Sequence, residues 1–157
     1  MDGQEVLEQT FEIIGRNYAR GGKASTKIKE VLKEIGIDSG VIRRAAIAAY
    51  EAEMNIVMYA QKGWITLLVT PASIQMKVTD QGSGIADIEL AMQEGYTTAE
   101  PWVRELGFGA GMGLPNIKKC SDTMDLQSVV GEGTTLKIEI MTGVNNEGKR
   151  INPEAKS

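Results

Sequence analysis

The chain has 157 residues, of which 42% are hydrophobic and 24% are charged, and its formal net charge at pH 7 is −4. This length and composition predict one compact domain with its own hydrophobic core. The acidic balance argues against a broad surface for nucleic acid or anionic lipid, and the single cysteine has no partner for an intrachain disulfide.

Histidine is absent from the sequence. Its absence removes the commonest general base, the usual zinc ligand and any phosphohistidine relay carried on this chain. Chemistry must therefore use carboxylates, amides, hydroxyls or a bound metal. The sequence begins with an acidic segment and contains no uncharged apolar run approaching the length of a membrane span, so we expect a soluble, cytoplasmic protein.

The first part of the chain predicts one strand and two helices. A β-like run over residues 8–14 is followed by a glycine, and apolar residues recur at helical spacing over residues 25–35, with Gly36 where a helix would end. A second, alanine-rich helix should begin at Asp38 or Ser39 and run to about residue 60. Its apolar stripe is predicted to comprise Val41, Ala45, Ala48, Ala52, Ile56 and Tyr59.

The remainder of the chain predicts strands and short helices separated by glycine-rich loops. Two β-rich runs over residues 64–70 and 74–79, joined by a turn, indicate an antiparallel hairpin whose second strand ends at Asp80. After it we expect a short helix over residues 87–94, a loop over 95–106 and another helix over 114–121. Two strands over 125–130 and 134–141 and a disordered polar tail over 143–157 should follow. Residues 1–142 would then form a single domain.

Glu51 and Asn55 are four positions apart on the predicted second helix. Side chains at this spacing lie one above the other, and both project to one edge of the apolar stripe, where a pocket could form. A carboxylate and an amide placed there would suit a general base and a metal ligand. The alternative is an ordinary solvated helix edge, since mixed polar residues on a helix flank are common.

Asp80 stands at the end of a predicted strand and is followed by Gly82 and Gly84. A carboxylate at a strand end can accept a hydrogen bond from an exocyclic amine, and this contact discriminates because an analogue without the donor leaves a charge unpaired. The alternative is an Asp-x-Gly turn that closes a hairpin.

Four alternating glycines, Gly107, Gly109, Gly111 and Gly113, precede a predicted helix. Their backbone amides and the dipole of that helix favour an anion, so the run predicts phosphate binding. Neither the dinucleotide G-x-G-x-x-G pattern nor the P-loop lysine is present. A hinge or lid is a further interpretation, compatible with phosphate binding.

The order of these motifs is more specific than any one of them. Glu51-x-x-x-Asn55, Asp80-x-Gly82-x-Gly84, the alternating glycines and a Gly-x-Gly-Thr box ending at Thr134 follow one another along the chain. In this order the chain resembles the ATP-binding superfamily shared by gyrase, the heat-shock chaperones, sensor histidine kinases and mismatch-repair ATPases. Its size and the stretches DQGSGIADIELAMQEGY and GFGAGMGLPNIKKCSD are most similar to the bacterial anti-sigma-factor and switch serine kinases.

The resemblance implies a two-layer α/β sandwich of the Bergerat type, with a mixed, mostly antiparallel sheet and helices on one face. It assigns Glu51 as the catalytic base and Asn55 as a ligand of Mg²⁺, and Asp80 with Thr134 to adenine. The remaining cofactor contacts would come from Gly82, Gly84, Gly107, Gly109, Gly111 and Gly113, with residues 95–106 as an ATP lid.

The same resemblance implies an ATP-dependent protein serine/threonine kinase that phosphorylates a serine of a small antagonist protein. Its partners would be that anti-sigma-factor antagonist and a sigma factor or signalling complex, and a homodimer is compatible with the family. The alternative is a non-catalytic, ATP-gated anti-sigma or adaptor module. The detached catalytic half of a histidine kinase is a third possibility, but it needs a phosphoacceptor histidine from another chain.

Overall fold

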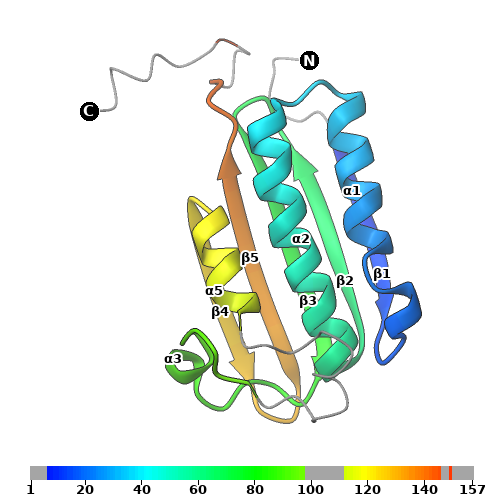
Figure 1. Ribbon diagram of the computed structural model, residues 1–157, viewed down its shortest axis with the longest axis vertical. Helices are drawn as coiled ribbons and strands as arrows, with labels where there is room; N and C mark the ends of the chain where they lie inside the picture. The colour runs from blue at the N-terminus through cyan, green and yellow to red at the C-terminus, as the bar shows by residue number, and fades with distance from the viewer. Residues whose placement is uncertain (1–6, 98–111, 146–148, 150–157) are drawn as a thin grey trace.

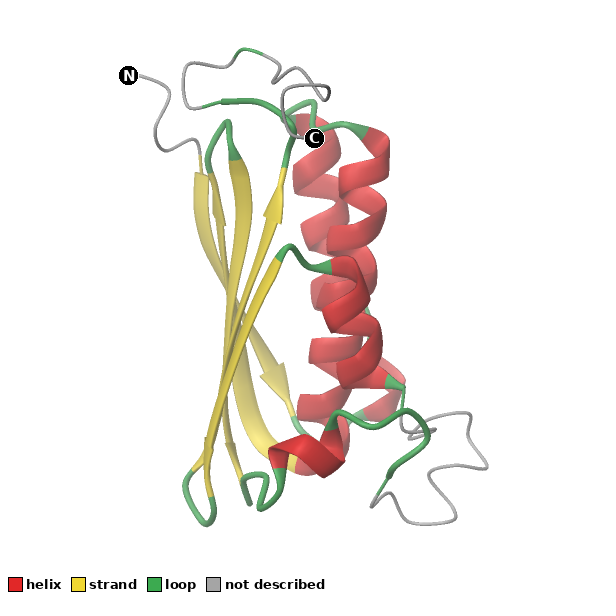
Figure 2. Cartoon of the chain, turned by 90° about the vertical axis from the view of Figure 1, so that its left-hand side faces the viewer, coloured by secondary structure: helices red, strands yellow, loops and turns green. Residues whose placement is uncertain are grey.

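One face of a five-stranded sheet is covered by helices in the computed structural model, which describes residues 7–97, 112–145 and 149 (Figures 1 and 2). The strand order is β1-β2-β3-β5-β4, and every neighbouring pair is antiparallel. The strands are β1 (Leu7–Ile14), β2 (Ala60–Val69), β3 (Ser73–Gly82), β4 (Thr123–Val129) and β5 (Gly133–Met141). The expected two-layer α/β sandwich is confirmed, and its antiparallel character extends to the whole sheet.

The helical layer has α2 at its centre, with α1 on one side and α5 on the other (Figure 1). Its elements are the 3₁₀ turn η1 (Tyr18–Arg20) and the helices α1 (Lys23–Glu34), α2 (Ser39–Tyr59), α3 (Ile88–Ala91) and α5 (Gly113–Cys120). Within the described ranges, none of these helices is long and apolar enough to cross a membrane.

Alanines let α2 lie close to the sheet. Ala45, Ala48, Ala49 and Ala52 are at most 1% exposed, and they share the buried core with Ile65, Leu67 and Val69 of β2. Small residues permit close approach of the two layers, while each buried aliphatic side chain contributes roughly 1.5–3 kcal/mol. The predicted apolar stripe of α2 is confirmed at all but its last residue, where the side chain of Tyr59 is on the surface.

The predicted elements are present, but several of their ends differ. β2 begins at Ala60, directly after α2, and β3 continues past Asp80 to Gly82. These two extensions pair with each other across a shift in register between Ala60 and Gly63. Such a bulge depends on the partner strand, so the hydrophobic pattern of either strand alone does not reveal it. α3 is also shorter than residues 87–94, and the predicted tail lies largely outside the described residues.

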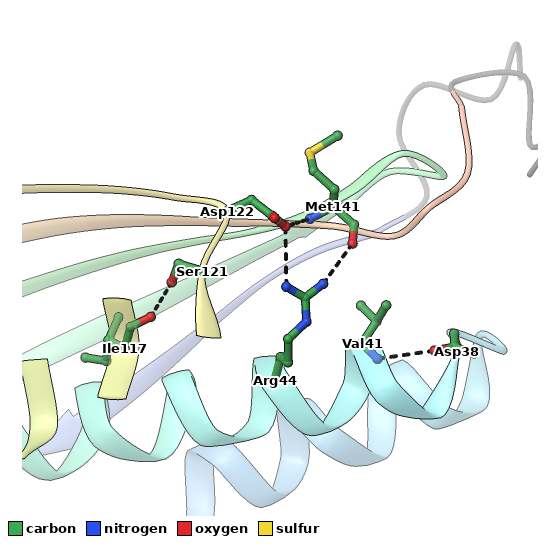
Figure 3. Close-up of polar contacts among 7 residues, drawn as sticks. All are labelled: Asp38, Val41, Arg44, Ile117, Ser121, Asp122 and Met141. Carbon is green, nitrogen blue, oxygen red and sulfur yellow. Dashed lines mark hydrogen bonds and ion pairs between the residues drawn. The ribbon is translucent and has the colours of Figure 1, made fainter. Parts of the chain in front are cut away.

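Arg44 joins the first half of α2 to the sheet (Figure 3). Its Nη2 donates to the carbonyl of Met141 at 3.3 Å, and its Nη1 lies 3.6 Å from Asp122 Oδ2, which also accepts from Met141 N. These partners lie just before β4 and at the end of β5, so one guanidinium holds α2 against both strands. Because the Arg44–Asp122 ion pair is partly exposed, it adds little to the free energy of unfolding, and its main effect is to position α2.

The carboxylate of Glu53, on α2, caps the amino end of α1. Glu53 is 2% exposed; its Oε2 accepts from Gly22 N at 3.0 Å and Ala24 N at 3.1 Å, and its Oε1 accepts from Ser25 N at 2.9 Å. The N-cap residue of α1 is Gly22, which has no side chain to do this. A buried carboxylate from another helix therefore satisfies the orphan amides of α1 and fixes α1 to α2.

Replacing Glu53 should destabilise the whole helical layer. Glu53→Ala leaves three amides without their acceptor, and we expect the free energy of unfolding to fall by about 2–4 kcal/mol in chemical denaturation. Glu53→Gln keeps the size but only one acceptor, so it should also destabilise. Glu30→Ala, on the exposed side of α1, is the matched control. A Glu53→Ala protein as stable as that control would contradict the capping role.

Candidate functional site

A cavity of about 590 Å³ opens between the last turns of α2, the ends of β3, β4 and β5, and the loop after β3. Every predicted site residue within the described ranges lines it: Glu51, Asn55, Asp80, Gly82, Gly84, Gly113 and Thr134. The predicted phosphate-loop residues Gly107, Gly109 and Gly111 lie outside the described residues, as does most of the expected lid. Residues from both layers of the sandwich thus meet at one end of the fold.

Asp80 lies near the end of β3 with its carboxylate in the wall of the cavity. Its Oδ1 accepts a hydrogen bond from the backbone N–H of Thr134, on β5, at 3.2 Å. Burial raises the pKa of the Asp80 carboxyl above its ordinary value, while the backbone hydrogen bonds from Thr134 and Gly82 act in the opposite direction. One oxygen is therefore held in place, and the carboxylate is partly desolvated where a ligand would meet it.

Two glycines allow the backbone to close around Asp80. Gly133 has a φ of +135°, and a Cβ there would lie 2.1 Å from the carbonyl oxygen of Asp80. Gly84 has a φ of +79°, and its Cβ would lie 2.5 Å from the carbonyl oxygen of Val129. A side chain at either position would strain the backbone. At Gly84 it would also push the loop after β3 away from the end of β4, and at Gly133 it would push the start of β5 away from Asp80 on β3. The predicted Gly84 therefore has a steric role, and Gly133, which was not among the predicted site residues, has the same role.

The α2 side of the cavity carries Glu51 and Asn55, as their spacing predicted. Asn116, on α5, donates from Nδ2 to Glu51 Oε2 at 2.7 Å, and this contact orients the carboxylate. The amide oxygen of Asn55 lies 3.2 Å from the point where a Cβ of Gly113 would be. The glycine at the start of α5 thus leaves room next to that oxygen. Asn116 was missed because only the packing of α5 on α2 brings it to Glu51.

Asn55 offers one ligand of the kind that a magnesium ion takes. An amide oxygen is a hard ligand, and the missing Cβ of Gly113 leaves space beside it. Among the described residues there is no group of three or more acidic, cysteine or histidine side chains that could hold a metal by itself. An ion here would therefore take its other ligands from water and from the phosphates of a bound molecule, which is the usual coordination of Mg²⁺.

The cavity also has apolar walls that the motifs did not indicate. Met58 from α2, Val78 from β3 and Leu136 from β5 line it and are buried, and Leu126 from β4 lies beside them. A few polar groups set into such walls are typical of pockets that bind a small molecule or cofactor. Tyr59 stands at the rim, where its hydroxyl shares a 3.3 Å hydrogen bond with Thr97 Oγ1.

Comparison with known proteins agrees with this arrangement. The histidine kinase-like ATPase domain family matches residues 17–140 of the chain. The serine/threonine-protein kinase RsbT of Bacillus subtilis is 34% identical over 113 residues, which cover 69% of this chain and 79% of RsbT.

Two further relatives are anti-sigma F factors. That of Caldanaerobacter subterraneus is 31% identical, over 62% of this chain and 68% of its own. That of Anoxybacillus flavithermus is 28% identical, over 72% and 66% respectively. The match to the family covers nearly all of the folded elements, including every described element that lines the cavity. The chain therefore belongs to the histidine kinase-like ATPase family and is similar within it to RsbT and the anti-sigma F factors.

Proposed function

We propose that this chain is an ATP-dependent serine/threonine-protein kinase that transfers the γ-phosphate of ATP to a serine of a small antagonist protein. The observation that carries the proposal is the cavity in which Asp80 stands with Glu51 and Asn55. A carboxylate suited to an amino group and a carboxylate–amide pair suited to phosphoryl transfer are present in one site. RsbT, by its name a serine/threonine-protein kinase, supports the same reaction.

The sheet side of the cavity binds the base in this proposal. Asp80 accepts a hydrogen bond from the exocyclic amino group of adenine, and Thr134 assists it from β5. The buried apolar side chains of α2, β3 and β5 contact the faces of the ring. A partly buried carboxylate discriminates between bases, because a base without the amino group leaves the charge unpaired.

The helical side binds the phosphates and carries the reaction. The amino end of α5, beginning at Gly113, lines the cavity and places the positive end of the helix dipole there. Asn55 would hold Mg²⁺, and the ion would supply charge neutralisation for the phosphates. Glu51, oriented by Asn116, accepts the proton of the attacking serine hydroxyl. None of these steps requires a histidine.

The substrate partner proposed here is a small antagonist protein that presents the serine to be phosphorylated. The regulated partner is a sigma factor or signalling complex that the kinase controls. Two of the relatives are named anti-sigma F factors, which supports a sigma factor as the regulated partner. The reaction and the partner exchange would take place in the cytoplasm.

Asp80→Asn tests the adenine contact. The amide presents an N–H where the carboxylate presented an acceptor, so the affinity for ATP should fall at least about tenfold, the loss expected for a charged hydrogen bond. Isothermal titration with ATP and Mg²⁺ measures it. Asp125→Asn, on an exposed position of β4, should leave the affinity unchanged. Equal affinity of Asp80→Asn and wild type would show that Asp80 does not bind the base.

The same substitution should stabilise the nucleotide-free protein. Burial raises the pKa of Asp80 above its ordinary value of 3.8, so the folded state holds the proton more tightly than the unfolded state. Stability is therefore lost as the pH rises through the interval above 3.8, where the folded carboxyl is forced to ionise. At pH 7 Asp80→Asn should unfold at a higher temperature than wild type, and the difference should shrink towards pH 4. A stability gap independent of pH would contradict this origin.

Glu51→Gln tests the base. The amide keeps the size of the side chain but cannot take a proton, so transfer of labelled γ-phosphate to a small antagonist protein should fall at least about 100-fold. The affinity for ATP should stay close to that of wild type. Glu30→Gln, exposed on α1, is the matched control. Normal transfer by Glu51→Gln would show that Glu51 is not the catalytic base.

An ATP-gated binding module is the alternative function. Capture of a partner that depends on nucleotide, without any phosphate transfer by the wild-type protein, would indicate this alternative.

A further inference from the structure

Ser128 lies on β4 directly opposite Thr134 of β5. Thr134 lines the cavity, whereas Ser128 is not among the residues that do. The Ser128 hydroxyl oxygen has three polar neighbours. They are the backbone N–H of Ile85 at 2.7 Å, the hydroxyl of Thr134 at 2.8 Å and the carbonyl of Gly133 at 3.1 Å.

The chemistry of these neighbours determines where the hydrogens are. A serine hydroxyl has one hydrogen to donate and two lone pairs that accept. The amide of Ile85 can only donate and the carbonyl of Gly133 can only accept, so Ser128 accepts from the first and donates to the second. The hydroxyl of Thr134 must then donate to Ser128, because only this arrangement makes all three contacts hydrogen bonds.

This arrangement decides what Thr134 offers to a ligand. With its one hydrogen directed to Ser128, the Thr134 hydroxyl presents only lone pairs to the cavity. Asp80 beside it, bonded to the backbone N–H of Thr134, also presents acceptors. The two residues together favour a purine with an amino group at C6. A purine with a carbonyl oxygen at that position would place it against two acceptors.

We propose that Ser128 is a positioning residue that holds the Thr134 hydroxyl as an acceptor and thereby excludes 6-oxopurine nucleotides such as ITP and GTP. This inference rests on the proposed function, because it needs a purine nucleotide at Asp80. The loop after β3 has a second attachment to the β4–β5 turn, from Gly131 N to the carbonyl of Ser83 at 2.9 Å. Removing the Ser128 hydroxyl therefore leaves that loop tethered.

Ser128→Ala tests the inference through the ratio of two affinities. Without its acceptor, the Thr134 hydroxyl can rotate and donate to the C6 oxygen of ITP. The dissociation constants for ATP and ITP, measured by titration with Mg²⁺, should therefore converge, with their ratio falling about fivefold, the effect of one neutral hydrogen bond. Gln127→Ala, the exposed neighbour on β4, should leave the ratio unchanged. In a Thr134→Val background, Ser128→Ala should no longer alter the ratio, since the hydroxyl that it orients is gone.

The outcomes separate this inference from the proposed function. Wild type that binds neither nucleotide would overturn the proposed function itself. Wild type that binds ATP and ITP equally would overturn only the selectivity. Equal weakening of both nucleotides by Ser128→Ala, or the same change of ratio in the Thr134→Val background, would show that Ser128 has a purely structural role. If the alanine variant does not fold, Ser128→Cys replaces it in the test. The thiol is close to the hydroxyl in size but is a weaker acceptor, so it should move the ratio in the same direction.

Discussion

The carboxylate of Glu53 is the contact on which the rest of the arrangement depends. Successive residues of an α-helix are about 100° apart, so Glu53 points about 200° away from both Glu51 and Asn55. Because Glu53 is bound to three amides at the start of α1, the rotation of α2 about its axis is fixed. With Glu53 directed to α1, the other two residues must face α5 and the cavity. A structural hydrogen-bond cluster on one side of the helix thus sets the functional pair on the other.

The two layers divide the work of the site between them. The sheet supplies Asp80, whose carboxylate is bound by the backbone of the neighbouring strand at Thr134. The helical layer supplies Glu51, which is bound by the side chain of Asn116. Asp80 is partly buried, which disfavours its charge; the backbone hydrogen bonds from Thr134 and Gly82 offset part of this cost to folding, and a ligand with a donor group would offset more of it. The empty site therefore lowers the stability of the folded protein, and a ligand that pairs with Asp80 would restore part of it.

The order of elements could be predicted because it depends on local patterns, whereas the site residues were proposed from the order of four motifs along the chain and the resemblance that this order carries. Helical spacing predicted that Glu51 and Asn55 share one edge of α2, and the strand pattern placed Asp80 before Gly84 near the end of a strand, but neither pattern alone distinguished a site from an ordinary helix edge or turn. Glu53 could not be recognised, since in sequence it is one more charge on a helix and its partners are 28 to 31 residues away. Asn116 is 65 residues from Glu51, so only tertiary packing identifies it.

The absence of histidine has a consequence for how this site is held together. The groups that orient Glu51 and Asp80 are the Asn116 amide and the backbone N–H groups of Thr134 and Gly82, and none of them titrates near neutral pH. A histidine in either place would exchange donor and acceptor roles as its proton came and went. Fixed donors keep the same orientation of each carboxylate throughout that range. The chemistry of the site then varies with the ionisation of the carboxylates and of the ligand, and not with the state of the residues that position them.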